Sequence, residues 1–134
     1  MTTLGLVVAQ FNRAITERME VHAVEAADEH GTEIASTVSV PGVYDAPLAA
    51  DRLARREDID AVCVLGTVIE GDTDHDQVVA HEAARSLSAV SIDRDTPITL
   101  GVTGPGMSSA EAREREDKGA EAVESALALT EALP

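Results

Sequence analysis

The order of its apolar and amphipathic segments most constrains what this chain can fold into. Short apolar or β-branched runs, typical of strands buried on both faces, alternate with longer stretches at helical spacing. Strands separated by helices in this way favour a parallel sheet with right-handed crossovers and helices on both faces. We therefore predict an α/β fold with three αβα layers around a four-stranded parallel sheet. The expected strands cover residues 4–9, 34–40, 61–65 and 97–102, and the expected helices cover residues 12–30, 45–56, 74–90 and 108 to near the end.

Local signals indicate where these elements begin and end. Asn12 and Asp45 are the expected N-caps of the first and second helices, and Gly66 is expected to close the third strand. Ser108 and Glu111 have the spacing of a capping box at the start of the last helix. No linker, repeat or low-complexity block interrupts the order, so we expect a single domain over residues 1–134.

The charge balance narrows the possible partners. The chain carries 25 acidic and 10 basic residues, a formal net charge of −15. Such a field repels nucleic acid and anionic membranes, so we expect neither as a partner. Nine of the basic residues are arginine and only Lys118 is lysine, which favours a halophilic protein. At about 1 M salt the Debye length falls to about 3 Å, so the repulsion among the excess carboxylates largely disappears. An acidic protein from an ordinary cytoplasm is the alternative.

The single cysteine and the N-terminal segment indicate a compartment. One cysteine, Cys63, allows no disulfide framework and is expected in the core of a cytoplasmic protein. The N-terminal segment has no basic region and too short an apolar run for a signal peptide or a membrane span. His22 and His30, on the first expected helix, are interpreted as surface residues.

Ligands of open parallel sheets bind outside the carboxyl ends of the strands. The segments expected at those ends are residues 10–12, 41–45, 67–75 and a glycine-rich loop at 103–107. They hold both aromatic residues of the chain, Phe11 and Tyr44. We therefore expect the chemistry at this edge.

Three segments resemble known metal- or nucleotide-binding motifs, but each lacks a residue that its motif requires. His81 begins a zinc-binding helix pattern, but Arg85 stands where its second histidine is needed. Residues 72–76 begin like a calcium loop, yet Gln77 occupies the glycine position. The glycines of 101–106 are not followed by the Lys-Ser/Thr pair of a nucleotide P-loop. We expect no metal.

The segment Gly71-Asp72-Thr73-Asp74-His75 is the strongest chemical candidate. A glycine turn leads into a helix N-terminus, where free N–H groups can hold a phosphate and His75 can act as an acid or base. The same residues also fit a plain helix start, with Thr73 as cap and the acids complementing the dipole. Since the acids repel phosphate, a cation must come from elsewhere, and the candidates are Arg113, Arg115 and Lys118.

Four segments together resemble, in order and spacing, the lumazine synthase family. They read AQFN at 9–12, VPGVYDAP at 40–47 and LGTVIEGDTDH at 65–75, while TGPGM at 103–107 resembles the archaeal branch. The resemblance covers essentially the whole chain and favours a catalytic His75. It implies a flavodoxin-like topology and an enzyme, a transferase, that condenses 5-amino-6-ribitylaminouracil with dihydroxybutanone phosphate. The product is dimethyl-ribityllumazine, the precursor of riboflavin, and water and phosphate leave without a cofactor or metal.

The resemblance also implies a role for each site residue. Phe11 stacks on the pyrimidine, Val43, Tyr44 and Asp45 hold the ring edge and ribityl chain, Thr67, Val68 and Ile69 line the other side, and Leu100 takes a ring-contacting position. Asp72 and Thr73 meet the butanone phosphate, His75 transfers protons, and Arg115 binds the phosphate, with Arg113 as the alternative and Lys118 as a weaker one. Asp45 replaces a commoner Glu, Leu100 a usual Phe, and Glu70 an often basic residue.

In the family, active sites lie between subunits of a pentamer, so we expect a homo-oligomer, with sixty subunits in twelve pentamers as a larger form. Two other functions stay open at this point. One is an archaeal riboflavin synthase on the same fold, and the other is a non-catalytic shell protein that binds flavin or lumazine. A regulatory domain of flavodoxin-like fold is disfavoured, because no acidic cluster follows the first strand at 10–12.

Overall fold

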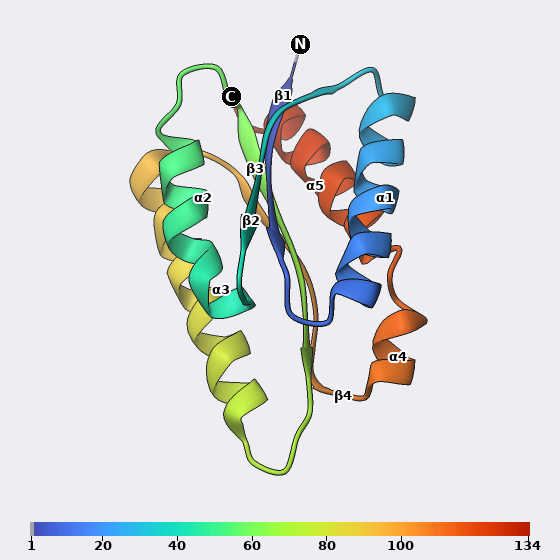
Figure 1. Ribbon diagram of the computed structural model, residues 1–134. Coiled ribbons are helices and arrows are strands. Elements are labelled where there is room, and N and C mark those ends of the chain that lie inside the picture. The colour runs from blue at the N-terminus through green and yellow to red at the C-terminus, as the bar shows by residue number, and fades with distance from the viewer. Residues whose placement is uncertain (1) are drawn as a thin grey trace.

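A parallel sheet lies between two layers of helices in the computed structural model, which describes residues 2–134 (Figure 1). The strands are β1 (Thr3–Ala9), β2 (Glu33–Val40), β3 (Ala61–Ile69) and β4 (Ile98–Met107). One face is covered by α1 (Arg13–Glu29), the short α4 (Ser109–Arg113) and α5 (Lys118–Ala132), and the other by α2 (Ala46–Ala54) and α3 (His75–Arg94). A 3-10 turn, η1 (Val43–Asp45), precedes α2.

All strand pairs are parallel, and the strand order is β2-β1-β3-β4. This order is the flavodoxin-like one, in which the connections leave β1 in opposite directions and open a crevice beyond the carboxyl ends of β1 and β3. The predicted three-layer αβα fold with a four-stranded parallel sheet is confirmed.

Alternation along the two central strands divides the core between the two faces. Leu6 and Val8 of β1 pack with α1 and α5, whereas Val7 packs with α2 and α3. Cys63 of β3 is fully buried on the α1/α5 side, as predicted, and burial raises the pKa of its thiol to about 11. Central strands buried on both faces explain why their sequences are continuous apolar runs.

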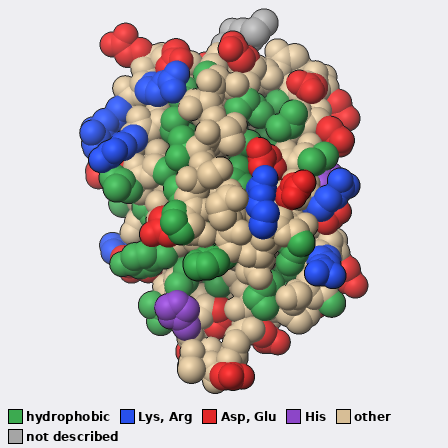
Figure 2. Space-filling view, in the orientation of Figure 1, with side chains coloured by type: hydrophobic (Ala, Val, Ile, Leu, Met, Phe, Trp, Pro, Cys, Tyr) green, Lys and Arg blue, Asp and Glu red, His purple; other side chains and the backbone are tan. Residues whose placement is uncertain are grey.

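Acidic side chains are spread over the face seen in Figure 2 and do not form one patch. Several pair with arginines; the Asp51 carboxylate accepts from Arg94 Nε at 2.7 Å and also pairs with Arg55, which lowers the pKa of Asp51. No helix within residues 2–134 combines the length and the apolar character needed to cross a membrane.

The prediction that Gly66 closes the third strand is wrong, because β3 continues to Ile69. Gly66 lies inside the strand, beneath Val43 of η1. A Cβ added there would lie 2.5 Å from Val43 Cγ2 and 3.2 Å from Ala9 Cβ. Glycine is required at this position by close packing and not by a turn.

The fourth strand is also longer than predicted. Residues 103–107, expected as a loop, continue β4 as an irregular stretch. Thr67 pairs with Thr103 and Ile69 with Met107, so Gly104, Pro105 and Gly106 together face the single residue Val68. Both glycines have positive φ, +96° and +71°, which explains their presence.

The last predicted helix is two helices separated by a turn at residues 114–117. The capping box is confirmed: Glu111 N–H donates to Ser108 Oγ at 3.2 Å, and Ser108 N–H donates to the Glu111 carboxylate at 3.1 Å. The chain then turns through residues without apolar side chains. Beyond the turn, Gly119 packs directly against the backbone carbonyl of Met19 in α1.

Helix starts differ from prediction in their side-chain bonds. Asn12 and Asp45 occupy the N-cap positions of α1 and α2, but neither side chain makes a cap hydrogen bond. Asn12 instead adopts a left-handed conformation, with φ of 63°. The first helix ends as predicted, with His30 as C-cap and Gly31 at φ +64°.

Candidate active site

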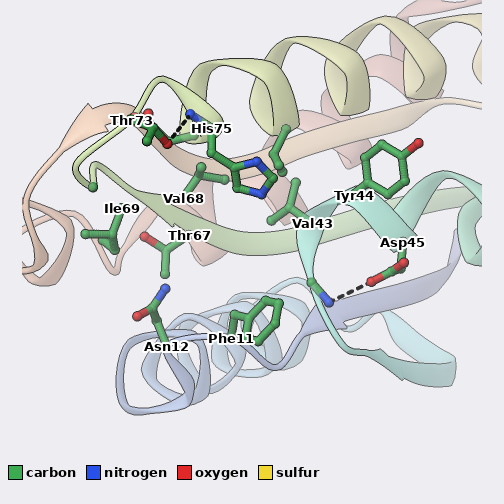
Figure 3. Close-up of a pocket in the computed structure, with 14 residues that line it drawn as sticks. Phe11, Asn12, Val43, Tyr44, Asp45, Thr67, Val68, Ile69, Thr73 and His75 are labelled. Atoms are coloured by element: carbon green, nitrogen blue, oxygen red, sulfur yellow. Dashed lines mark hydrogen bonds between the residues drawn. The ribbon is translucent and has the colours of Figure 1, made fainter.

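A cavity of about 330 Å³ opens at the carboxyl ends of β1, β2 and β3 (Figure 3). This is the edge at which the sequence predicted the chemistry. The cavity is lined by Phe11, Asn12, Gly42, Val43, Tyr44, Asp45, Thr67, Val68, Ile69, Gly71, Thr73, His75, Asp76 and Val79.

The turn after β1 holds Phe11 on one side of the cavity. The Phe11 N–H donates to the Pro41 carbonyl at 2.9 Å, which ties this turn to the segment after β2. The Phe11 ring lies directly over Gly42, where a Cβ would come within 2.8 Å of the ring. The ring nevertheless remains 68% exposed, so a free apolar face is available to a planar ligand.

The turn after β2 supplies a buried residue and two exposed ones. Val43 is buried over Gly66, whereas Tyr44 is 63% exposed. The Asp45 carboxylate accepts from the Gly42 N–H at 3.0 Å, which fixes the turn and leaves the second carboxylate oxygen without a hydrogen bond from residues 2–134. This free oxygen can accept a hydrogen bond from a ligand hydroxyl or amide.

The end of β3 forms the floor of the cavity. Thr67 is buried, and its Oγ1 accepts a hydrogen bond from Thr103 Oγ1 at 2.7 Å. Val68 and Ile69 follow with largely buried side chains. Just beyond the strand, the Glu70 N–H donates to the Met107 carbonyl of β4 at 2.9 Å.

The start of α3 closes the opposite side. The His75 N–H donates to Thr73 Oγ1 at 3.3 Å, but the N-cap position belongs to Asp74 and not to Thr73, which lines the cavity. In Figure 3 the His75 imidazole and the Phe11 ring lie on opposite sides of the cavity. An exposed imidazole beside a cavity can exchange protons with a ligand held there.

The cavity lining is acidic. It includes Asp45 and Asp76 and no lysine or arginine of residues 2–134, and Asp72 and Asp74 lie on the turn that enters α3. The described part of the chain also contains no group of three or more side chains suited to hold a metal ion. A phosphate at this helix start therefore needs a cation that this chain's own cavity does not supply.

Three predicted site residues lie outside the lining. Asp72 is exposed on the turn before α3. Leu100 lies on the edge strand β4, paired with Val64, and is 43% exposed. Arg115 lies in the turn between α4 and α5, where its guanidinium donates to the Glu111 carbonyl at 3.4 Å. The alternatives Arg113 and Lys118 flank this turn and also lie outside the lining.

Some lining residues were not among the predicted site residues. Asn12, Gly42 and Gly71 line the cavity and lie in the same turns as predicted site residues. Their position in those motifs could have indicated that they belong to the site. Asp76 lines the cavity as well. Its position directly after His75, in the first turn of a helix facing the site, could have marked it.

Comparison with known proteins agrees with this geometry. The family model described as 6,7-dimethyl-8-ribityllumazine synthase matches residues 1–133. The chain belongs to this family. Proteins named 6,7-dimethyl-8-ribityllumazine synthase are 65% identical in Halobacterium salinarum, over 99% of this chain and 100% of the relative, and 60% identical in Halorubrum lacusprofundi, over 99% of both. The synthase of that name from Methanocaldococcus jannaschii is 46% identical over 99% of this chain and 94% of its own length. The predicted resemblance to the archaeal branch, with relatives from halophiles, is confirmed.

Proposed function

We propose that this protein is a 6,7-dimethyl-8-ribityllumazine synthase, a transferase of riboflavin biosynthesis. It condenses 5-amino-6-(D-ribitylamino)uracil with 3,4-dihydroxy-2-butanone 4-phosphate and releases water and phosphate. The observation that carries the proposal is the cavity in which an exposed Phe11 ring faces His75 at the start of α3, in a chain of this family.

The pyrimidine substrate binds at the β1 and β2 side. Phe11 stacks on the pyrimidine, because Gly42 supports one face of the Phe11 ring and the ring is otherwise largely exposed. Val43, Tyr44 and Asp45 hold the ring edge and the ribityl chain, and the free Asp45 oxygen accepts from a ribityl hydroxyl. On the far side of the ring, contacts come from Thr67, Val68 and Ile69 at the end of β3.

The butanone phosphate binds at the turn before α3, where Asp72 and Thr73 contact it. The 5-amino group attacks the ketone carbon and forms an imine with loss of water. Phosphate then leaves, and the resulting enol tautomerises to a ketone. The ribitylamino nitrogen attacks this second carbonyl carbon and closes the ring with loss of a second water. His75 moves the protons in these steps. Holding both reactants in one cavity converts their encounter into an intramolecular step, which supplies a large part of the rate.

The cavity of one chain is completed by a neighbouring subunit. Leu100 and Arg115 lie outside the lining of their own chain, on an edge strand and an exposed turn. We assign them to the cavity of the adjacent subunit in a pentamer, where Leu100 contacts the ring and Arg115 binds the phosphate. Twelve pentamers in a sixty-subunit shell are the larger assembly consistent with this arrangement.

Residues 1–134 form one domain in this proposal, since all four strands belong to one sheet with helices on both faces. Its partners are the two small-molecule substrates and copies of itself, because the charge of −15 disfavours nucleic acid and anionic membranes. A lone buried thiol fits a reducing cytoplasm. The chemistry uses no cofactor and no metal.

Turnover of the two purified substrates tests the function. We expect dimethyl-ribityllumazine and one phosphate per turnover, with the product identified by its mass and absorption. Riboflavin formed from dimethyl-ribityllumazine alone would instead indicate a riboflavin synthase. Stoichiometric binding of lumazine or flavin without any turnover would indicate a binding or shell protein, and either result would refute the proposal.

A further inference from the structure

We propose that Asp76 is a positioning residue, which holds the Gly104–Gly106 bulge of β4 against β3 and thereby sets both the cavity floor and the start of α3. The inference rests on the proposed function for its kinetic consequences. Asp76 is the one charged residue among the buried residues of the described chain, with 7% of its surface exposed. A buried carboxylate is costly unless it is hydrogen-bonded, so its partner matters.

The bulge lies beside β3, the strand whose end forms the cavity floor. Three residues of β4 face Val68 alone, between the pairs Thr67–Thr103 and Ile69–Met107. At Gly104 an added Cβ would lie 2.1 Å from the Val68 carbonyl oxygen, so the bulge touches the backbone of β3 at this point. A shift of the bulge therefore moves Val68, which lines the cavity.

Asp76 connects this bulge to the opposite side of the cavity. Its Oδ2 accepts from the Gly106 N–H at 2.9 Å, a charge-assisted hydrogen bond between α3 and β4. On the β3 side, the Thr103–Thr67 hydroxyl bond of 2.7 Å fixes the beginning of the bulge. β3 thus holds the bulge at both ends, through Thr103 and Met107, and the first turn of α3 holds it at Gly106.

His75 precedes Asp76 in that same first turn. Because the helix start is attached to the bulge through Asp76, the backbone of His75 and the floor at Val68 are kept in a fixed relation. This relation matters for catalysis, since a displacement of about 1 Å between reacting groups can cost about 100-fold in rate. An acidic residue at a helix start also complements the dipole, and the experiment must separate the two roles.

Replacement of Asp76 by Asn, Glu and Ala separates them in the full-length protein. The Asn side chain keeps an acceptor at the same distance and loses the charge, whereas Glu keeps the charge and is one methylene longer. We expect kcat/KM to fall about 10- to 100-fold in Asp76→Ala, with kcat lowered and the KM of the pyrimidine substrate raised. Asp76→Asn should stay within about threefold of wild type, and Asp76→Glu should be worse than Asp76→Asn.

Asp74→Ala is the matched control, because it removes an exposed carboxylate from the same helix start without touching the bulge. It is a control for hydrogen exchange and not for kinetics, because Asp74 lies between Thr73 and His75 of the proposed site. Hydrogen exchange of peptides covering residues 103–107 should be faster in Asp76→Ala and unchanged in Asp76→Asn and Asp74→Ala. This measurement needs no turnover, so it tests the anchor even if the wild-type protein makes no lumazine and the proposed function fails.

Two patterns would overturn the inference. One is wild-type kinetics in Asp76→Ala together with unchanged exchange of the bulge. The other is the order in which Asp76→Glu matches wild type and Asp76→Asn is as impaired as Asp76→Ala, because the charge and not the hydrogen bond would then be what matters. If Asp76→Ala does not fold, the comparison of Asn with Glu still decides between these outcomes.

Discussion

Replacing Gly66 by alanine should damage the active site from inside the core. The added Cβ would lie 2.5 Å from Val43 Cγ2, whereas carbon atoms in contact are about 3.5–4.0 Å apart. Val43 must therefore retreat by about 1 Å or more, because β3 is a central strand paired on both sides. Overpacking of this kind costs about 1–3 kcal/mol of the free energy of unfolding.

The displacement reaches the pyrimidine site, because Val43 begins the turn that carries Tyr44 and Asp45. We expect a higher KM for the pyrimidine substrate and a kcat/KM lowered by about 10- to 100-fold, with a smaller effect on the KM of the phosphate substrate. Steady-state kinetics with each substrate varied in turn, together with denaturant unfolding, measures both effects.

Two further variants make this prediction specific. Gly5→Ala adds a methyl to β1 away from the strand's carboxyl end and outside the cavity lining. The nearest atoms there, at 3.2 Å, are flexible side-chain ends of Ile59 and Leu53. This variant should leave the kinetics unchanged. The double variant Gly66→Ala/Val43→Ala removes the clashing methyl, so its loss of stability should be smaller than the sum of the single losses. Additive losses, or wild-type kinetics in Gly66→Ala, would refute the packing argument.

The remaining predictions concern the proposed site and the conditions in which it works. Phe11→Ala should weaken binding of the pyrimidine by about 1–3 kcal/mol, on analogy with base–aromatic stacking, whereas His75→Ala should lower kcat by about 10²- to 10⁴-fold and spare pyrimidine binding, as titration of each variant would show. Arg115→Ala should raise the KM of the butanone phosphate, and lysine should replace the arginine poorly; a raised KM in Arg113→Ala alone would move the phosphate site to that residue. Turnover should persist in EDTA, and activity that is lost there and restored by a divalent ion would contradict the metal-free mechanism. The melting temperature should rise with KCl into the molar range, and a flat or falling profile would contradict salt adaptation.

The layers of the fold were predictable because their cause is local. Continuous apolar runs such as 4–9 and 61–65 indicate strands buried on both faces, and the connecting helices restrict the sheet to a parallel one. The edge of the sheet that carries the cavity followed from the same topology. These steps need only periodicity and chain direction.

The errors lie where distant packing overrides a local signal. Gly66 and the glycines of 103–107 look like strand ends, since glycine commonly marks turns. In the structure Gly66 makes room for Val43, and the other glycines form a bulge within β4. Likewise, Asp45 has the spacing of a helix cap, but its carboxylate is taken by the nearer Gly42 N–H. The sequence alone does not show whether the Asp45 carboxylate accepts from the Gly42 N–H or from the helix start.

One chain brings together only part of the predicted site. Phe11, Tyr44, Asp45, Thr73 and His75 meet in one cavity because all follow the carboxyl ends of neighbouring strands.

Because the cavity is acidic, an arginine that binds the phosphate has to act at short range. The lining carboxylates repel an incoming phosphate ester over many ångströms at low salt, but at about 1 M salt their field decays within about 3 Å. An arginine in contact with a phosphate, with nitrogen and oxygen about 2.7–2.9 Å apart, lies inside that range and retains its attraction. High salt therefore removes the repulsion of Asp45 and Asp76 at a distance and leaves a direct arginine contact largely intact. An acidic synthase can thus bind an anionic substrate, provided that the neighbouring subunit places its guanidinium on the phosphate itself.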